Sequence, residues 1–309
     1  MATSETTESI LVLGAGELGT PILRELSKSQ WGHHHITVLL RPSTIASTDT
    51  KKQSLLKELR ELGIHFLPGD LATSTTSVLA QLFQGFHTII SATGYIAGPG
   101  TQLKLARAVL QAGIPRYFPW QFGVDYDTIG KGSAQELFDE QLDVRTLLRA
   151  QSRTEWVIIS TGVFMNFLFS PFFGVVDLEN AVVHALGSFD NRITVTTVED
   201  IGRLTAAIVF AEPRIKNTVL FTAGDTLSYN QVADIVDAVL KSQGRKARRD
   251  VWELSTLQEK LGQEPDDVLK KYAVVFAAGR GVAWDVEQTY NGRHNIPVVD
   301  AKQWAIQNL

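Results

Sequence analysis

The sequence predicts an α/β fold, a doubly wound parallel sheet followed by a smaller C-terminal α/β substrate lobe. Short apolar runs alternate with helical patterns over the first 160 residues, which is typical of βαβ units. A glycine-rich turn, Gly14-Ala15-Gly16-Glu17-Leu18-Gly19, follows the first apolar run and opens a helical pattern. The chain has 309 residues, 44% of them hydrophobic, which is enough for one large core or two unequal lobes.

Each element of the expected sheet is a short apolar run, and each expected helix fills a gap between two runs. The expected strands are 9–13, 35–40, 64–67, 87–92, 115–119 and 156–160. The expected helices are 18–28, 51–62, 74–84, 101–112 and 134–150. The glycine turn therefore stands at the first strand–helix junction of the sheet.

The alternation breaks down after residue 160. Residues 162–173 are rich in phenylalanine without a clean period, so they either line an apolar pocket or pack in the core. Further strands are expected at 192–198 and 217–222, a helix start at 198–202, and helices at 228–241, 255–261 and 265–279 before polar loops. We therefore expect residues 1–160 to form the NAD(P)-binding domain, with 186–210 returning to it, and 161–309 to form the substrate lobe.

The three glycines of the turn predict a Rossmann-type dinucleotide site. Gly14, Gly16 and Gly19 stand where a strand turns sharply into a helix and a pyrophosphate approaches the backbone. The helix start, with Glu17 and Leu18, offers free N–H groups and a positive dipole end to the phosphates. The alternative is a tight strand–helix turn that binds no ligand.

The end of the second expected strand indicates which dinucleotide is bound. An acidic residue there would accept a hydrogen bond from the ribose 2′-hydroxyl group and favour NAD. This chain has Arg41, followed by Pro42-Ser43-Thr44, and a guanidinium suits a 2′-phosphate through a bidentate contact. We expect NADPH/NADP+ as the cofactor; otherwise Arg41 is a solvated surface residue.

Ligands of open α/β sheets lie beyond the carboxyl ends of the strands, so the residues after the later strands complete the expected site. Asp70 suits the adenine side, or else serves as a loop or cap carboxylate. The remaining expected cofactor contacts are Ala92, Thr93, Gly94, Phe122 and Gly123. The expected substrate contacts are Tyr95, Trp120, Gln121, Phe164 and Phe167.

Composition and missing motifs exclude several function classes. The formal net charge of −4 argues against a general nucleic-acid or membrane-surface binder, and the basic run 241–249 is interpreted as a solvated loop. Without cysteine there is no disulfide framework or thiolate metal site, and His33-His34-His35 lacks a nearby carboxylate, so no metal is expected. No tyrosine is followed by a lysine four residues later, and no GxSxG motif occurs.

The chain also lacks the signals of secretion or membrane insertion. Its start, MATSETTES, is polar, with no cationic region followed by an apolar one, and no apolar stretch reaches a membrane-spanning length. We expect a cytoplasmic protein that acts on a small molecule, with no nucleic-acid or membrane partner. Nothing in the sequence predicts the oligomeric state.

Between residues 102 and 145 the chain resembles the isoflavone reductase-like branch of the NmrA-like, atypical short-chain dehydrogenase family. The matching stretches are Gln102-Leu103-Lys104, Gln111-Ala112-Gly113, Arg116-Tyr117-Phe118-Pro119, Phe122-Gly123, Phe138 and Val144-Arg145. The stretches PWQFGVDYD and LFDEQLDVR are most similar to fungal CipA-type isoflavone reductase homologues. The resemblance covers most of residues 8–210 and implies an NADPH-dependent reductase active in secondary metabolism.

One departure from that family concerns its chemistry. The family carries a lysine, regarded as the general acid/base, between the phenylalanine and the Val-Arg pair, and this chain has Gln141 there. Gln141 falls on the inward stripe of the helix expected at 134–150, so its amide either faces a ligand or bonds to neighbouring backbone. A glutamine can donate a hydrogen bond to a substrate carbonyl but cannot exchange protons, which leaves water, Tyr126 or Lys131 as the proton source.

Three functions are therefore compatible with the sequence. The first is an NADPH-dependent reductase of an aromatic or polyketide-like molecule, with Gln141 orienting the substrate. The second is a non-catalytic NADP(H)-sensing regulator of the NmrA-like type. The third keeps the cofactor but catalyses a redox-neutral isomerisation or elimination.

Overall fold

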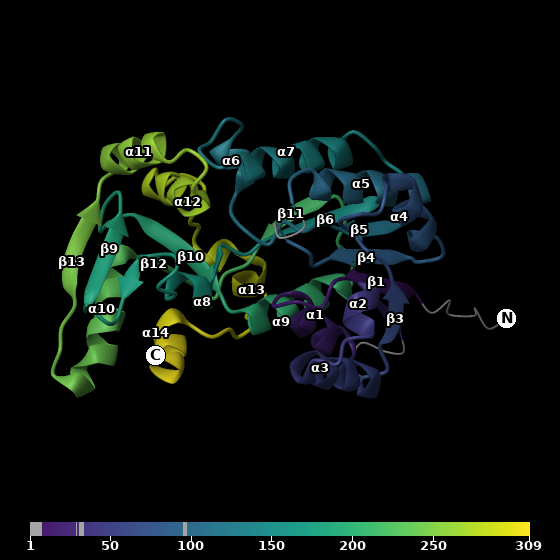
Figure 1. Cartoon of the computed structure of the whole chain (residues 1–309), viewed down its shortest axis with the longest axis horizontal. Helices are drawn as coiled ribbons and strands as arrows, with labels where there is room; N and C mark the ends of the chain where they lie inside the picture. Colours follow the sequence, from purple (N-terminus) through teal and green to yellow (C-terminus); the bar gives the residue numbers. More distant parts are fainter. Residues whose placement is uncertain (1–7, 29, 31–33, 95–97) are drawn as a thin grey trace. The chain divides into compact units, whose positions relative to one another are not determined.

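Seven strands form one sheet in the order β11-β6-β5-β4-β1-β2-β3 in the computed structural model, which describes residues 8–28, 30, 34–94 and 98–309 (Figure 1). These strands are β1 (Ser9–Leu13), β2 (His35–Leu40), β3 (His65–Pro68), β4 (Thr88–Ser91), β5 (Arg116–Phe118), β6 (Glu155–Ser160) and β11 (Thr218–Phe221). The pairings from β3 through β6 are parallel. Because β1 lies between β2 and β4, the winding reverses beside β1, where open α/β sheets bind ligands. The predicted fold class is confirmed.

Helices cover both faces of this sheet. They are α1 (Gly19–Leu26), α2 (Pro42–Ile45), α3 (Thr50–Glu61), α4 (Thr76–Phe83), α5 (Thr101–Ala112), α7 (Glu136–Arg149) and α9 (Val198–Val209). In Figure 1, α4 and α5 lie on one face, and α1, α3 and α9 lie on the other. The strands are apolar on both sides for this reason, and Leu11, Val12 and Leu13 of β1 are fully buried.

Short polar signals set where the helices of this sheet begin and end. The Asp49 carboxylate accepts a hydrogen bond from the Lys52 N–H at the start of α3, and the Thr75 hydroxyl accepts one from the Val78 N–H at the start of α4. Gly113 adopts a left-handed conformation with φ of +67° and ends α5. These capping residues explain why the predicted helices agree with the observed ones to within two residues.

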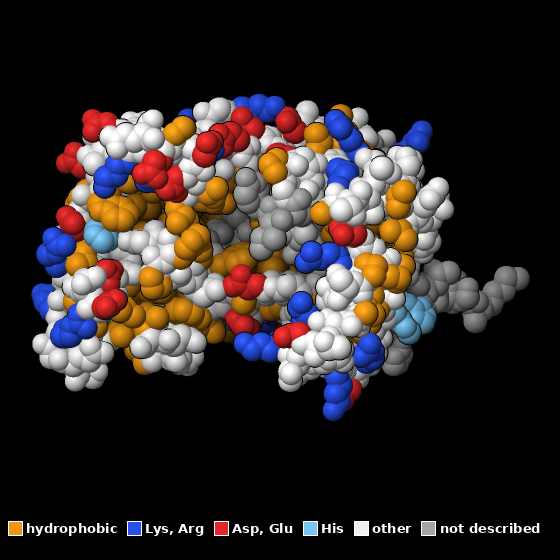
Figure 2. Space-filling model, in the orientation of Figure 1, with side chains coloured by type: hydrophobic (Ala, Val, Ile, Leu, Met, Phe, Trp, Pro, Cys, Tyr) orange, Lys and Arg blue, Asp and Glu red, His pale blue; other side chains and the backbone are white. Residues whose placement is uncertain are grey.

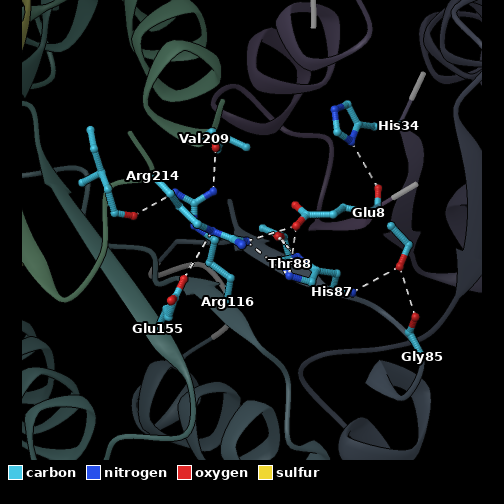
Figure 3. Close-up of polar contacts among 11 residues, drawn as sticks. Glu8, His34, Gly85, His87, Thr88, Arg116, Glu155, Val209 and Arg214 are labelled. Carbon is cyan, nitrogen blue, oxygen red and sulfur yellow. Dashed lines mark hydrogen bonds and ion pairs between the residues drawn. The ribbon is translucent and has the colours of Figure 1, made fainter. Parts of the chain in front are cut away.

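A buried arginine stands at the amino edge of the sheet, opposite the edge where the glycine turn lies. Arg116, the first residue of β5, is 2% exposed, and its guanidinium lies over the Phe118 ring. Its Nη1 donates to the Val209 carbonyl oxygen at 2.6 Å and its Nη2 to that of Ile215 at 3.0 Å (Figure 3). Burial lowers the pKa of Arg116 to about 10, which still leaves the group cationic at neutral pH.

A second arginine joins the strand starts on this edge. Arg214 donates to the His87 Nε2 at 3.2 Å and forms ion pairs with Glu155 and Glu8 at 3.3 and 3.4 Å (Figure 3). Glu8, His87 and Glu155 directly precede or begin β1, β4 and β6. The segment after α9 is therefore tied to the sheet by charged hydrogen bonds and ion pairs.

The chain divides into two compact units. The first comprises Met1–Gln121, Asp143–Ile158 and Ile201–Val219, and the second comprises Phe122–Leu142, Ile159–Asp200 and Leu220–Leu309. Compared with the boundaries expected from the sequence, residues 122–142, 159–160 and 186–200 belong to the second unit, whereas 201–210 return to the first. The reason is that α7 and α9 each cross from one unit to the other.

The second unit contains two small sheets with the strand orders β12-β10-β7 and β13-β9-β8. Its strands are β7 (Val163–Phe164), β8 (Val176–Asp177), β9 (Val182–Leu186), β10 (Arg192–Thr196), β12 (Asp225–Ser228) and β13 (Arg248–Trp252). Its helices are α6 (Tyr126–Ile129), α8 (Met165–Leu168), α10 (Tyr229–Leu240), α11 (Leu254–Gln263), α12 (Val268–Ala277), α13 (Tyr290–Arg293) and α14 (Ala301–Asn308), with 3₁₀ turns Lys241–Gln243 and Val286–Gln288. Ser228 and Gln231 form a capping box at the start of α10.

Two sequence expectations for this unit are wrong. The basic run 241–249 is not a solvated loop throughout, because Arg248 and Arg249 lie in β13, which pairs in parallel with β9. Arg249 also forms an ion pair with Asp234, so its charge is balanced by a residue of the same unit. The end of the chain is not all polar loop either, because the Asp300 side chain accepts a hydrogen bond from the Gln303 N–H and starts α14.

Candidate functional site

The three glycines of the turn have different surroundings. Gly14 has a φ of +98°, and a Cβ built on it would lie 2.6 Å from the Thr93 Oγ1. A Cβ on Gly19 would collide with the Gly14 carbonyl oxygen, whereas a Cβ on Gly16 would have no atom of the described residues within 4 Å. Packing therefore requires glycine at the first and third positions. At Gly16 the backbone borders open space, as a site for an approaching pyrophosphate requires.

The start of α1 adjoins this open backbone. Leu18 is the N-cap residue and no side chain caps the helix, so the first-turn N–H groups are not covered by a side-chain oxygen. The Gly14 N–H donates to the Leu39 carbonyl oxygen at 3.2 Å, which fixes the turn against β2. Glu17 is exposed in the same turn. The arrangement suits an anion at the helix N-terminus.

Arg41 directly follows β2 and is exposed. Its backbone caps α2, with the Thr44 N–H donating to the Arg41 carbonyl oxygen at 2.8 Å. Within residues 8–28, 30, 34–94 and 98–309, the guanidinium makes no recorded hydrogen bond or ion pair. An exposed cation at the carboxyl end of β2, beside the glycine turn, is suited to a phosphate.

Asp70 follows β3 and performs the capping role that was one of its two expected roles. Its Oδ1 accepts hydrogen bonds from the Ala72 N–H at 2.9 Å and the Thr73 N–H at 3.4 Å. The hydrogen bond from Ala72 is the main reason that the pKa of Asp70 is lowered, and the positive charge of Arg41 contributes. The structure thus brings Asp70 and Arg41 within electrostatic reach of one another.

The segment after β4 lies against the glycine turn and against an indole ring. The Thr93 Oγ1 donates to the Leu13 carbonyl oxygen at 2.7 Å, and the Ala92 Cβ faces Gly19. A Cβ on Gly94 would lie 2.7 Å from the Trp120 ring, so glycine is required there for this approach. The structure therefore assembles the expected cofactor residues of the first unit. Tyr95 lies outside the described residues.

Gln121, which was expected to contact the substrate, is bonded to an arginine in the structure. Its side chain is fully buried, and its Oε1 accepts a hydrogen bond from the Arg145 Nε at 2.7 Å. Arg145 is fully buried as well, so a buried cation requires this oxygen. Gln121 stabilises the interior of the first unit.

The remaining expected residues lie in the second unit, beginning with the segment after β5. Phe122 is buried, and the Gly123 carbonyl oxygen accepts hydrogen bonds from the Thr161 and Gly162 N–H groups at 3.0 and 2.9 Å. The Tyr126 hydroxyl lies against Gly123, where any Cβ would collide with it. Tyr126 is 3% exposed, so its hydroxyl is an interior group rather than a surface one.

Gln141 lies on the buried face of α7, as the helical pattern predicts. It is 0% exposed, and Phe138, one turn earlier on α7, is also buried. The Phe138 ring contacts the Tyr126 ring at 5.1 Å and the Tyr272 ring at 5.7 Å, both edge-on. Lys131, the other expected proton source, is exposed in the turn before α7.

Aromatic rings continue from this point through the second unit. Phe167 is partly exposed and lies 6.4 Å from the Tyr272 ring and 4.7 Å from the Phe173 ring. Phe173 contacts Phe276 in turn at 5.7 Å, and Phe164 is partly exposed at the end of β7. The phenylalanine-rich segment thus both packs in the core and leaves ring edges exposed. Tyr272 was missed by sequence reasoning, because only tertiary packing brings α12 to α7.

The described part of the chain shows no grouping of three or more His, Cys, Asp or Glu residues that could hold a metal ion. None of its helices is long and apolar enough to cross a membrane. On the face shown in Figure 2, acidic and basic side chains are interspersed.

Known proteins similar to this chain include curated relatives and solved structures. An NmrA-like family domain-containing oxidoreductase of Gibberella moniliformis is 49% identical over 96% of this chain and 97% of its own length. Phenylcoumaran benzylic ether reductase 1 of Arabidopsis thaliana is 26% identical over 97% of this chain and 96% of its own length. The binary complex of leucoanthocyanidin reductase with NADPH from Vitis vinifera shares the fold, with a TM-score of 0.78 and 17% identity over 97% of this chain and 98% of that one.

The relatives agree in kind, since they carry the names of oxidoreductases and reductases and one similar structure is an NADPH complex. The model of the NmrA-like family matches residues 6–289, nearly the whole chain. The resemblance inferred from the sequence motifs is therefore confirmed: this chain belongs to the NmrA-like family.

Proposed function

We propose that this chain is an NADPH-dependent reductase that acts on an aromatic or polyketide-like small molecule. The observation that carries the proposal is the pairing of the open backbone at Gly16 with the uncommitted guanidinium of Arg41. The open backbone accommodates a pyrophosphate, and the guanidinium accommodates a 2′-phosphate. The names of the relatives, oxidoreductase and reductase, support the reaction class.

The candidate cofactor residues of the first unit would each hold a different part of the dinucleotide. Gly16 and the start of α1 would receive the pyrophosphate, Arg41 the 2′-phosphate, and Asp70 would border the adenine. Thr93 and Gly94 would border the nicotinamide ribose. The dinucleotide supplies a hydride when it is bound.

The residues of the second unit would serve the substrate. The rings of Phe164 and Phe167 offer apolar edges to a flat molecule. Gln141 would donate an amide hydrogen bond to a substrate carbonyl and stabilise negative charge as it develops on that oxygen. Because an amide does not titrate near neutral pH, the proton that completes the reduction of an enone would come from water.

Stopped-flow mixing of the NADPH-loaded protein with a panel of aromatic enones tests the proposal. We expect NADPH to be oxidised with at least one member of the panel, which is measured as a loss of absorbance at 340 nm. No oxidation with any member would contradict a reductase of this substrate class.

Gln141 is buried and does not titrate, which also favours two other candidates. One is an NADP(H)-sensing regulator, and the other is a redox-neutral isomerase or lyase. A sensor would bind NADP+ and NADPH with different affinities, and it would bind a protein partner in only one of these two complexes. An isomerase or lyase would convert its substrate without any net change in NADPH.

The variant Gln141→Lys separates these candidates further. In a reductase site the lysine introduces a titrating group, and burial lowers its pKa, so we expect the rate to acquire a new dependence on pH. Thr146→Lys, at an exposed position on the same helix, is the control and should leave the pH profile unchanged. If both profiles match that of the original protein, Gln141 does not take part in the chemistry.

A further inference from the structure

The first turn of α5 contains a buried glutamine whose hydrogen bonding is only half complete. Gln102 is 3% exposed, and its Nε2 donates to the Thr93 carbonyl oxygen at 2.9 Å. Its Oε1 is buried and has no hydrogen-bond partner among the residues that the structure describes. A buried acceptor without a partner is costly and is rare away from functional sites. Folding alone therefore does not account for this side chain.

The partner of Gln102 belongs to the segment that contacts the glycine turn. Thr93 accepts from Gln102 through its carbonyl oxygen and donates from its hydroxyl to the Leu13 carbonyl oxygen at 2.7 Å. The same hydroxyl lies against Gly14. Hydrogen bonds thus connect the start of α5 to the end of β1 through Thr93. A shift of Gln102 would move the loop that borders the expected nicotinamide ribose.

Lys104, two residues later, holds the loop at the other end of the proposed cofactor site. Its Nζ donates to the carbonyl oxygens of Leu71 and Ala72 at 2.6 and 2.9 Å. The Ala72 N–H in turn donates to the Asp70 carboxylate at 2.9 Å, so Ala72 is held by Lys104 on one side and by Asp70 on the other. The charge of Arg41, the residue expected to bind the 2′-phosphate, acts on Asp70. Lys104 therefore fixes the turn that carries Asp70.

We propose that the first turn of α5 is a positioning element for the dinucleotide, with one residue for each half of the ligand. Gln102 positions the loop after β4 for the nicotinamide half, and Lys104 positions the loop after β3 for the half that carries the 2′-phosphate. Both act through backbone groups and neither contacts reacting atoms. The inference rests on the cofactor named in the proposed function.

Equilibrium titration with three ligands tests this division of tasks. The ligands are NADPH, NADH and adenosine 2′,5′-bisphosphate, which lacks the nicotinamide half. The variants are Gln102→Met and Lys104→Met, and the controls are Gln111→Met and Arg107→Met at exposed positions on the same helix. A thermal melt of each variant reports separately whether the fold is kept.

The two variants should give opposite patterns. Gln102→Met should weaken NADPH and NADH by similar factors, about tenfold, and leave the bisphosphate within about twofold. Lys104→Met should weaken NADPH and the bisphosphate about tenfold while NADH changes less, so the preference for NADPH falls. Lys104→Arg keeps donors for both carbonyl oxygens and should restore that preference. The controls should bind all three ligands as the original protein does.

Equal loss of all three ligands, or no loss of any, would overturn the positioning role. If Gln102→Met does not fold, the result with the partly exposed Lys104 and its arginine rescue decides the inference. Failure of the proposed function looks different. If the chain has no NADP(H) site, the original protein binds none of the three ligands; if it binds NADPH but is not a reductase, the binding pattern persists while the stopped-flow test shows no oxidation of NADPH.

Discussion

At the scale of single residues, identical amino acids have distinct tasks. Gly14 and Gly19 are glycines because a Cβ would strike Thr93 or the Gly14 carbonyl oxygen, whereas no atom of the described residues lies within 4 Å of a Cβ built on Gly16. The sequence motif predicted all three together and could not separate them. The helical periodicity of the sequence predicted the burial of Gln141. It did not predict the hydrogen bond between Gln121 and Arg145, which joins side chains 24 residues apart.

This difference predicts separate outcomes for two alanine variants. Gly16→Ala should keep the thermal stability of the original protein, because the added methyl group enters open space. It should weaken NADPH binding about tenfold or more, because the methyl group takes the place of the pyrophosphate. Gly19→Ala should lose stability, because the backbone of Gly14 cannot move away. Thermal melts and NADPH titration measure both effects, and unchanged NADPH binding by Gly16→Ala would rule out this position for the pyrophosphate.

At the scale of helices and strands, agreement with the sequence follows the apolar runs. β1 and β2 have the predicted bounds because both are apolar runs in the middle of a parallel sheet. β13 was missed because its sequence, Arg-Arg-Asp-Val-Trp, is mostly polar and is a strand only through its pairing with β9. β8 was missed because two residues carry no period. Pairing partners, rather than local sequence, decide such strands.

The amino edge of the sheet predicts a dependence of stability on pH. The His87 Nε2 lies 3.2 Å from the Arg214 guanidinium and 3.3 Å from the Glu8 carboxylate, and its Nδ1 lies 2.9 Å from the Thr88 hydroxyl. Burial lowers the pKa of His87, and the charges of Arg214 and Arg116 add to this, while Glu8 and Glu155 oppose it. A lowered pKa means that the unfolded chain binds the proton more readily. Stability should therefore be full above the ordinary histidine pKa of about 6.5 and fall as the pH drops below it.

Urea unfolding between pH 5 and pH 8 measures this effect. The variant His87→Gln keeps an acceptor for Arg214 without titrating, so its stability should fall less between pH 7 and pH 5. His294→Gln, at the exposed C-cap residue of α13, is the control and should retain the original slope. Equal slopes for all three proteins would remove His87 as the cause.

At the scale of the whole molecule, the family and the doubly wound parallel sheet could be predicted from the sequence, because the glycine turn, the alternating apolar runs and the motifs around β5 are local patterns. The aromatic cluster of the second unit could not be predicted to the same degree. Phe138, Phe167 and Tyr272 come from three separate helices of the second unit, and only packing brings their rings together. The cofactor is therefore the best-supported part of the proposed function.

The central claim is that residues of the first unit hold NADP(H) through a 2′-phosphate site at Arg41. Calorimetric titration of the original protein and of Arg41→Ala with NADPH and NADH tests it most directly. We expect the original protein to prefer NADPH, and Arg41→Ala to lose about ten- to a hundredfold in NADPH affinity, as the removal of one charge-assisted contact implies, with NADH within about twofold. Equal losses for both ligands, or no preference for NADPH in the original protein, would contradict the claim.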